Sequence, residues 1–61
     1  MSRAKAKLIT LLVAFDAPML PGRLLAEEPP QPETVRQAMA YLRAELDEIE
    51  RDLLPQEGPS R

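Results

Sequence analysis

The sequence predicts an all-α protein built as a helical hairpin, and three observations support this fold class. Apolar residues between positions 35 and 53 recur at alternating spacings of four and three, which is the heptad pattern of an amphipathic helix. Residues 3–15 form a second, shorter apolar segment whose composition favours a helix. The proline-rich residues 16–32 connect the two segments. In a chain of 61 residues, these parts make up a single small domain.

The first predicted helix, residues 3–15, reads RAKAKLITLLVAF. Its start is basic and rich in alanine, and its second half is almost continuously apolar. The β-branched residues Ile9, Thr10 and Val13 lean towards a strand, and so short an apolar run leaves helix and strand open on periodicity alone. Alanine and lysine favour the helix. In a helix, one stripe collects the side chains of Ala4, Leu8, Leu11, Leu12 and Phe15.

The connector, residues 16–32, contains five of the seven prolines of the chain. Pro18, Pro21 and Gly22 interrupt regular structure, and the sequence RLLAEE that follows is long enough for one or two helical turns. A connector of this length without any structure is unusual in a small domain. We therefore expect its apolar residues to pack against the helices; these are Met19, Leu20, Leu24 and Leu25.

The long amphipathic helix is expected over residues 33–54. Thr34 and Gln37 have the spacing of a capping box, and alternatively Pro32 occupies the first helical position. Pro55 ends the helix, and residues 56–61 are expected to form a flexible tail. The apolar seam of this helix consists of Val35, Met39, Leu42, Leu46, Ile49 and Leu53.

The two halves of the chain carry opposite net charge. Residues 1–30 sum to +1 and residues 31–61 sum to −3, which together give the net charge of −2. If the first helix folds back antiparallel on the long helix of the same chain, its basic start approaches the acidic end of that helix. The residues concerned are Arg3, Lys5 and Lys7 on one side and Glu50 and Asp52 on the other. An antiparallel pair of long helices from two chains, with Arg36 facing Glu50, is the alternative.

The small size of the chain predicts a protein partner. A domain of this length buries only about 60% of the surface that its unfolded chain exposes. With no cysteine and no histidine, disulfide and common transition-metal staples are excluded. We therefore expect self-association, or docking on a larger host protein, through an interface made of Leu8, Leu11, Leu12, Phe15, Val35, Met39, Leu42, Leu46, Ile49 and Leu53.

Most functional classes lack the residues that they need. No histidine is present to activate a hydroxyl group, and the two glycines do not form a phosphate-binding loop. Basic residues are too few, and not interleaved with aromatic residues, for nucleic acid. The expected function is therefore a non-enzymatic, cytoplasmic protein-interaction module without a cofactor, metal or small-molecule substrate, such as an accessory subunit, an assembly factor or an oligomeric adaptor.

Two alternative functions are each supported by a different sequence feature. The acidic stripe from Glu45 to Asp52 fits a small inhibitor or antitoxin-like factor that occupies a basic site on its target. The basic and then apolar start of the chain also fits a secretory signal over residues 1–26, in which case the product is a secreted peptide. Attraction of the same basic start to a membrane surface is a weaker option, because only three basic residues contribute.

Overall fold

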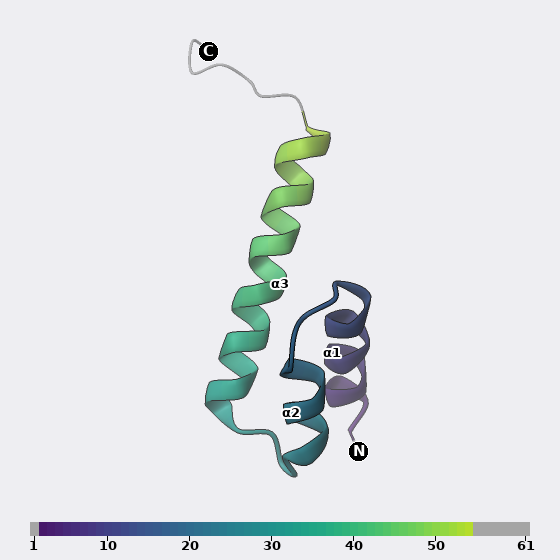
Figure 1. Cartoon of the computed structure of the whole chain (residues 1–61), viewed down its shortest axis with the longest axis vertical. Coiled ribbons are helices and arrows are strands. Elements are labelled where there is room, and N and C mark those ends of the chain that lie inside the picture. The colour runs from purple at the N-terminus through teal and green to yellow at the C-terminus, as the bar shows by residue number, and fades with distance from the viewer. Residues whose placement is uncertain (1, 55–61) are drawn as a thin grey trace.

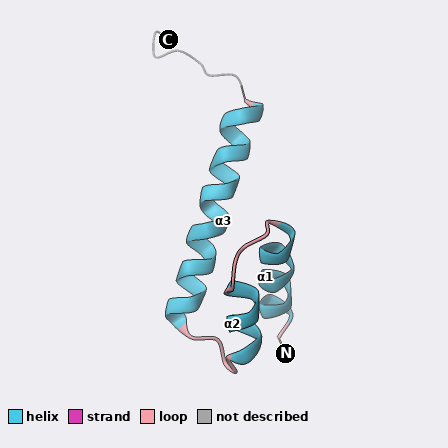
Figure 2. Ribbon diagram, viewed as in Figure 1, coloured by secondary structure: helices cyan, strands magenta, loops and turns pink. Residues whose placement is uncertain are grey.

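The computed structural model describes residues 2–54, and every regular element in this range is a helix (Figures 1 and 2). Helix α1 spans Arg3–Ala14, α2 spans Leu20–Ala26 and α3 spans Pro32–Leu53. The all-α prediction is confirmed, and the strand alternative for the first segment is wrong. The predicted connector contains a helix of its own, α2, and the predicted tail at 56–61 lies outside the described residues.

Both ends of α1 are closed by local hydrogen bonds. The Ser2 hydroxyl accepts a 3.1 Å hydrogen bond from the backbone N–H of Lys5, which is an N-cap. After the helix, the N–H of Asp16 donates to the carbonyl of Val13 and the N–H of Ala17 donates to that of Leu12. With Asp16 in the left-handed region at φ 58°, this pair of bonds is a Schellman motif. The helix therefore ends within one residue of the predicted position.

Helix α2 forms around residues that the sequence marks as helix breakers. Pro21 lies in its first turn, where a missing N–H costs no hydrogen bond and the fixed φ suits a helix. Leu24 is fully buried and Leu20 is half-buried, as expected. The expectation was wrong for Met19 and Leu25, whose side chains are exposed. Met19 precedes the helix in a left-handed conformation, which directs the chain from the connector into α2.

The start of α3 is capped by a residue from outside the helix. Pro32 occupies the first turn, and the capping box of Thr34 and Gln37 does not form. Instead, the carboxylate of Glu27 accepts a 2.9 Å hydrogen bond from the N–H of Gln31 and a 2.8 Å hydrogen bond from the Thr34 hydroxyl. Thr34 is almost fully buried, and its polar hydroxyl is tolerated there because it has this hydrogen-bond partner.

Helices α1 and α3 run in the same direction, with α2 returning between them (Figure 1). The ammonium group of Lys5 binds Glu28, just before α3 begins, and the carbonyl of Phe15 accepts a 2.9 Å hydrogen bond from the hydroxyl of Tyr41. The hairpin is thus formed by α2 and α3. The basic start of α1 lies beside the start of α3.

The predicted contact of Arg3, Lys5 and Lys7 with Glu50 and Asp52 of the same chain is therefore wrong. The reason is α2: because the connector contains a returning helix, the chain reverses direction twice between α1 and α3, and these two helices become parallel.

The core lies where the three helices meet. It consists of the buried side chains of Leu12, Ala17, Leu24, Ala38 and Leu42. Helix α3 contributes its buried residues at a spacing of four, from Thr34 through Ala38 to Leu42. Beyond Glu45 every described residue of α3 is exposed, so the second half of this helix extends past the other two (Figure 1).

Candidate functional site

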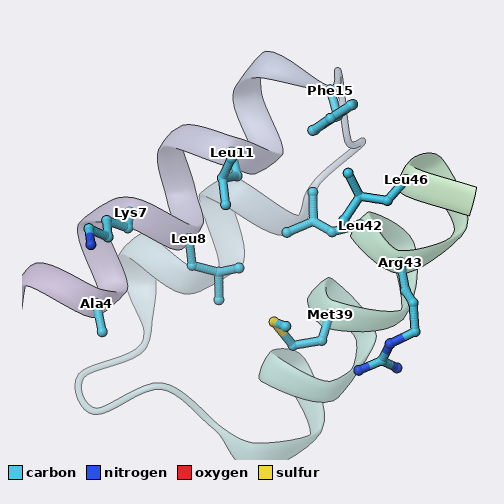
Figure 3. Close-up of a pocket in the computed structure, with 9 residues that line it drawn as sticks. All are labelled: Ala4, Lys7, Leu8, Leu11, Phe15, Met39, Leu42, Arg43 and Leu46. Carbon is cyan, nitrogen blue, oxygen red and sulfur yellow. The ribbon is translucent and has the colours of Figure 1, made fainter. Parts of the chain in front are cut away.

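An apolar groove lies between α1 and α3 (Figure 3). Its volume is about 370 Å³, and most of its lining is hydrocarbon. Helix α1 and its C-cap supply four of the five residues of the predicted stripe, and α3 supplies three residues of its seam. The residues that line this groove are Ala4, Lys7, Leu8, Leu11, Phe15, Met39, Leu42, Arg43 and Leu46.

The groove exists because only some of the apolar residues on the facing sides of α1 and α3 turn into the core. Leu12 and Leu42 turn into the core and hold α1 against α3. Neighbouring apolar residues on the same faces are left in contact with solvent: Leu11 is 47% exposed, Met39 is 42% exposed and Leu46 is 57% exposed. Side chains of this size are usually buried, and a run of them along one groove is typical of an interaction surface.

Beyond the groove, the apolar stripe of α3 continues into the part of the helix that extends past α1 and α2. We call residues 46–53 the projecting half of α3. Ile49 and Leu53 continue the apolar stripe here and are 40% and 74% exposed. At 1.5 Å per residue, this part of the helix is about 12 Å long. Its other faces are strongly acidic, with Asp47, Glu48, Glu50 and Asp52 against a single arginine.

The predicted interface residues are distributed over four places. Six of them line the groove: Leu8, Leu11, Phe15, Met39, Leu42 and Leu46. Ile49 and Leu53 lie on the projecting half. Leu12 is completely buried in the core, and Val35 is half-buried at the opposite end of α3, near Leu24 and Pro30. Leu12 thus holds the fold together and presents no free surface.

The rim of the groove is basic. Lys7 of α1 and Arg43 of α3 both lie at the groove and are exposed (Figure 3). Within residues 2–54, the only ion pair joins Lys5 to Glu28. Lys7 and Arg43 therefore form no ion pair with any other described residue, and their charges are available to a ligand that enters the groove.

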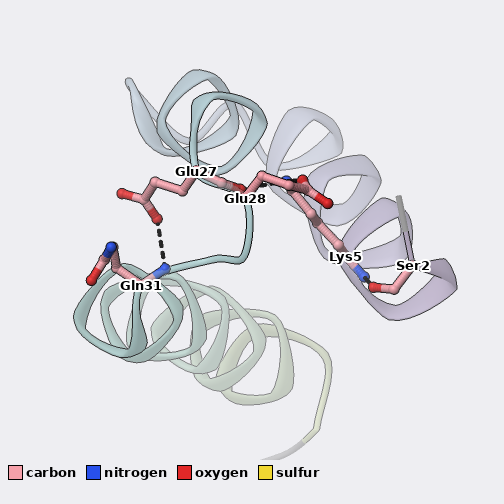
Figure 4. A network of polar contacts seen from close by, with 5 residues as sticks. All are labelled: Ser2, Lys5, Glu27, Glu28 and Gln31. Atoms are coloured by element: carbon pink, nitrogen blue, oxygen red, sulfur yellow. Dashed lines mark hydrogen bonds and ion pairs between the residues drawn. The ribbon is translucent and has the colours of Figure 1, made fainter.

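The buried Lys5 was not predicted, and its role is structural (Figure 4). Its ammonium group donates a 2.6 Å hydrogen bond to the carbonyl of Glu27 and a 2.7 Å hydrogen bond to the carboxylate of Glu28. The side chain of Lys5 is only 3% exposed. One sequence signal points to this burial: Lys5 precedes Leu12 by seven residues, and so lies on the same side of α1 as the core leucine.

Two carboxylates next to this lysine are held in the ionised form. The hydrogen bond from Lys5, together with its positive charge, lowers the pKa of Glu28 below its ordinary value of 4.5. The pKa of Glu27 is lowered as well, first by the hydrogen bond from the N–H of Gln31 and then by the Thr34 hydroxyl. Together these bonds fix the turn between α2 and α3 against the first turn of α1.

Tyr41 fixes the other end of α1. Its hydroxyl donates to the carbonyl of Phe15, which has no partner within α1 because the helix ends there. Burial, followed by the negative charges of Glu45 and Asp16, raises the pKa of Tyr41 above its ordinary value of 10.0. With Lys5 at one end and Tyr41 at the other, the walls of the groove are held at a fixed separation.

The described residues contain no cluster of three or more histidine, cysteine, aspartate or glutamate side chains positioned to hold a metal ion. Among the helices of residues 2–54, none has the length and apolar character needed to cross a lipid bilayer. Comparison of the chain with protein-family models, with curated proteins and with solved structures finds no match in any of the three.

Proposed function

We propose that this chain is a non-enzymatic protein-interaction module that binds another protein surface through the apolar groove and the projecting half of α3. One observation carries the proposal. Exposed apolar side chains of the groove and of the projecting half recur along one side of α3, from Met39 through Leu46 and Ile49 to Leu53. Burying such side chains stabilises a complex by about 25 cal/mol for each Å² of apolar surface removed from water.

The fold supports this role because the stripe is not needed to close the core. Leu12, Leu24 and Ala38 are fully buried without any contribution from the projecting half. A helix whose apolar residues remain exposed after the domain has folded gains stability only from an external surface. The rigid walls of the groove, held by Lys5 and Tyr41, reduce the entropy lost on binding.

In this function, α1 is an integral part of the module. It supplies Leu12 to the core and Leu8, Leu11 and Phe15 to the groove. Without it, both the core and the binding surface would be lost. We therefore expect the active form to retain residues 3–14, which intact mass measurement of the protein from its native cells checks. Loss of about 26 N-terminal residues would instead favour the secreted peptide, with its short signal segment.

Site-specific photo-crosslinking tests the proposal inside cells. A photoreactive phenylalanine analogue replaces Leu46, which lies on the exposed stripe, or Ala44, which is exposed on the other side of α3. We expect a protein adduct from position 46, either with another protein or with a second copy of the chain, and little or none from position 44. Equal crosslinking at the two positions, or none at position 46, would contradict the proposed binding surface.

Salt separates this function from that of an acidic inhibitor. Apolar docking persists in 0.5 M salt, because burial of hydrocarbon does not depend on long-range charge. Binding through the acidic face of the projecting half would weaken strongly, since screening at that concentration reduces the range of charge interactions to about 4 Å. We expect the adduct at position 46 to form in cell extracts with 0.5 M salt as well.

A further inference from the structure

We propose that the protein which fills the groove is a second copy of this chain, bound so that the two α3 helices run antiparallel. This inference rests on the proposed function and names its partner. In such a dimer, the projecting half of each α3 lies in the groove of the other copy. The arrangement has twofold symmetry, so every contact between the copies occurs twice.

Charge is the first observation in favour of this partner. The groove has a basic rim, at Lys7 and Arg43, and the projecting half is acidic, at Glu50 and Asp52 among others. Lys7 and this acidic end cannot meet within one chain. Because α1 and α3 are parallel, the basic start of α1 lies beside the start of α3, far from its acidic end (Figure 1).

An antiparallel second copy brings these charges together. Its acidic α3 end then lies beside the starts of the first copy's α1 and α3, where Lys7 and Arg36 are. Opposite charges across an interface select the orientation and exclude others. A parallel dimer would place the two acidic halves side by side, and Glu45 would face Glu50 of the other copy. Like charges in that position are unfavourable, and the contact occurs twice. The antiparallel form brings the two Arg43 side chains together once at its centre, but Arg36 faces Glu50 twice, so the balance of charges favours the antiparallel form.

The apolar spacing fits the same arrangement. In the antiparallel register that matches Leu42 with Leu46 of the other copy, Met39 also meets Ile49. The same register places the end of the stripe, at Leu53, beside Val35. The exposed residues of the projecting half thus face the groove and the half-buried start of α3. All of the exposed seam positions are covered at once. The covering surface is the same stripe on the second copy, so no further protein is needed.

Charge reversal in two separate chains tests the arrangement. One variant carries Lys7→Glu and Arg36→Glu, and the other carries Glu50→Lys and Asp52→Lys. All four positions are exposed, so circular dichroism should show the helical content of the unchanged chain for both variants. Sedimentation equilibrium at low salt then measures association of each variant alone and of an equimolar mixture.

The unchanged chain is expected to dimerise. Each variant alone is expected to have a dimer Kd at least about tenfold higher, because each reversal creates like-charge contacts twice. The mixture is expected to form a heterodimer with the affinity of the unchanged chain, since both sets of contacts are then between opposite charges. A mixture that associates no better than the separate variants, or an unchanged chain that is monomeric at about 100 μM, would overturn the proposal.

Thiol crosslinking distinguishes the two orientations. The chain has no cysteine, so introduced thiols have no competitors. A mixture of Lys7→Cys and Asp52→Cys chains is expected to form a mixed disulfide on mild oxidation. Asp52→Cys alone is the control, and rapid formation of its homodimer would mean a parallel pair and overturn the antiparallel arrangement.

The tests separate this inference from the proposed function. If the unchanged chain is monomeric but an analogue at position 46 still crosslinks to a different protein, the dimer is wrong and the interaction module stands. If neither dimer nor adduct forms, both are wrong.

Discussion

The ammonium group of Lys5 lies 2.7 Å from a carboxylate oxygen of Glu28, and this ion pair joins the first turn of α1 to the residues just before α3. One partner is almost completely buried and the other is largely exposed, with side chains 3% and 71% accessible. The pair therefore costs little desolvation on the glutamate side, while the lysine keeps two acceptors for its buried charge. It sets the direction of α1 relative to α3, and thereby the shape of the groove.

Replacing Lys5 by methionine should destabilise the folded chain by about 1–3 kcal/mol, because the Glu27 carbonyl and the Glu28 carboxylate both lose their donor. The methionine retains most of the apolar stem, so little packing is lost. The free energy of unfolding in urea measures the effect. Lys7→Met is the matched control, and both are made in the Leu46→Asp background to remove any contribution from association. Equal effects of the two substitutions would show that Lys5 does not hold the helices together.

Stability is expected to fall in mild acid. Because the pKa values of Glu27 and Glu28 are lowered in the folded chain, their stabilising effect is complete above the unfolded value of 4.5. It is lost as the pH falls through 4.5 towards the lower folded values, since the unfolded state binds protons first. The melting temperature should thus be constant between about pH 7 and pH 5 and then decrease.

The double variant Glu27→Gln with Glu28→Gln is the control for this pH dependence. It should be less stable at pH 7, and its melting temperature should change less between pH 5 and pH 3. An unchanged acid profile in the double variant would mean that other carboxylates cause the transition.

Two alanines of α3 should respond differently to a charged substitution, because they lie on opposite sides of the helix. Ala38 is completely buried and Ala44 is exposed. Ala38→Asp should cost about 3 kcal/mol or more, which suffices to unfold a domain of this size, whereas Ala44→Asp should change stability by less than about 0.5 kcal/mol. Circular dichroism melting curves compare the two. A folded Ala38→Asp variant would place the core on a different face of α3.

Removing a glycine from α2 and introducing a glycine just before it should both stabilise the chain. Gly22 is helical, and a Cβ added there meets no atom within 4 Å, so Gly22→Ala should gain about 0.5–1 kcal/mol. Met19 has a left-handed backbone and a side chain that is 78% exposed, so Met19→Gly relieves about 1 kcal/mol of strain and loses little packing. Chemical denaturation measures both effects. Destabilisation by Met19→Gly would show that its exposed side chain makes a contact that matters.

The sequence predicts the helices well because their signals are local. The spacing from Val35 to Leu53 depends only on α3. Four of the five residues of the predicted N-terminal stripe line the groove, and the fifth, Leu12, lies in the core. The capping of α3 was not predictable in this way, because Glu27 reaches its first turn from α2. Pro21 suggests an interruption in the sequence, yet it lies in the first turn of α2. Its effect depends on whether the residues after it pack against the other helices.

The direction of α1 was the larger error, and it has the same physical origin. Charge pairing between Lys5 and Glu50 was expected within one chain, but the burial of Leu24 in the core stabilises α2 and makes α1 parallel to α3. The choice among orientations thus depends on packing over long sequence distances. Ala38 is not part of the apolar seam, yet it lies in the core, where its small side chain lets the helices approach closely.

The melting temperature of the unchanged chain, measured over a wide range of protein concentration, tests the central claim most directly. If the exposed stripe of α3 is covered by a second copy, the melting temperature rises with concentration by mass action. In the Leu46→Asp variant it should be lower and independent of concentration, while the helical signal at low temperature persists. A melting temperature that is the same for both proteins at every concentration would contradict the account.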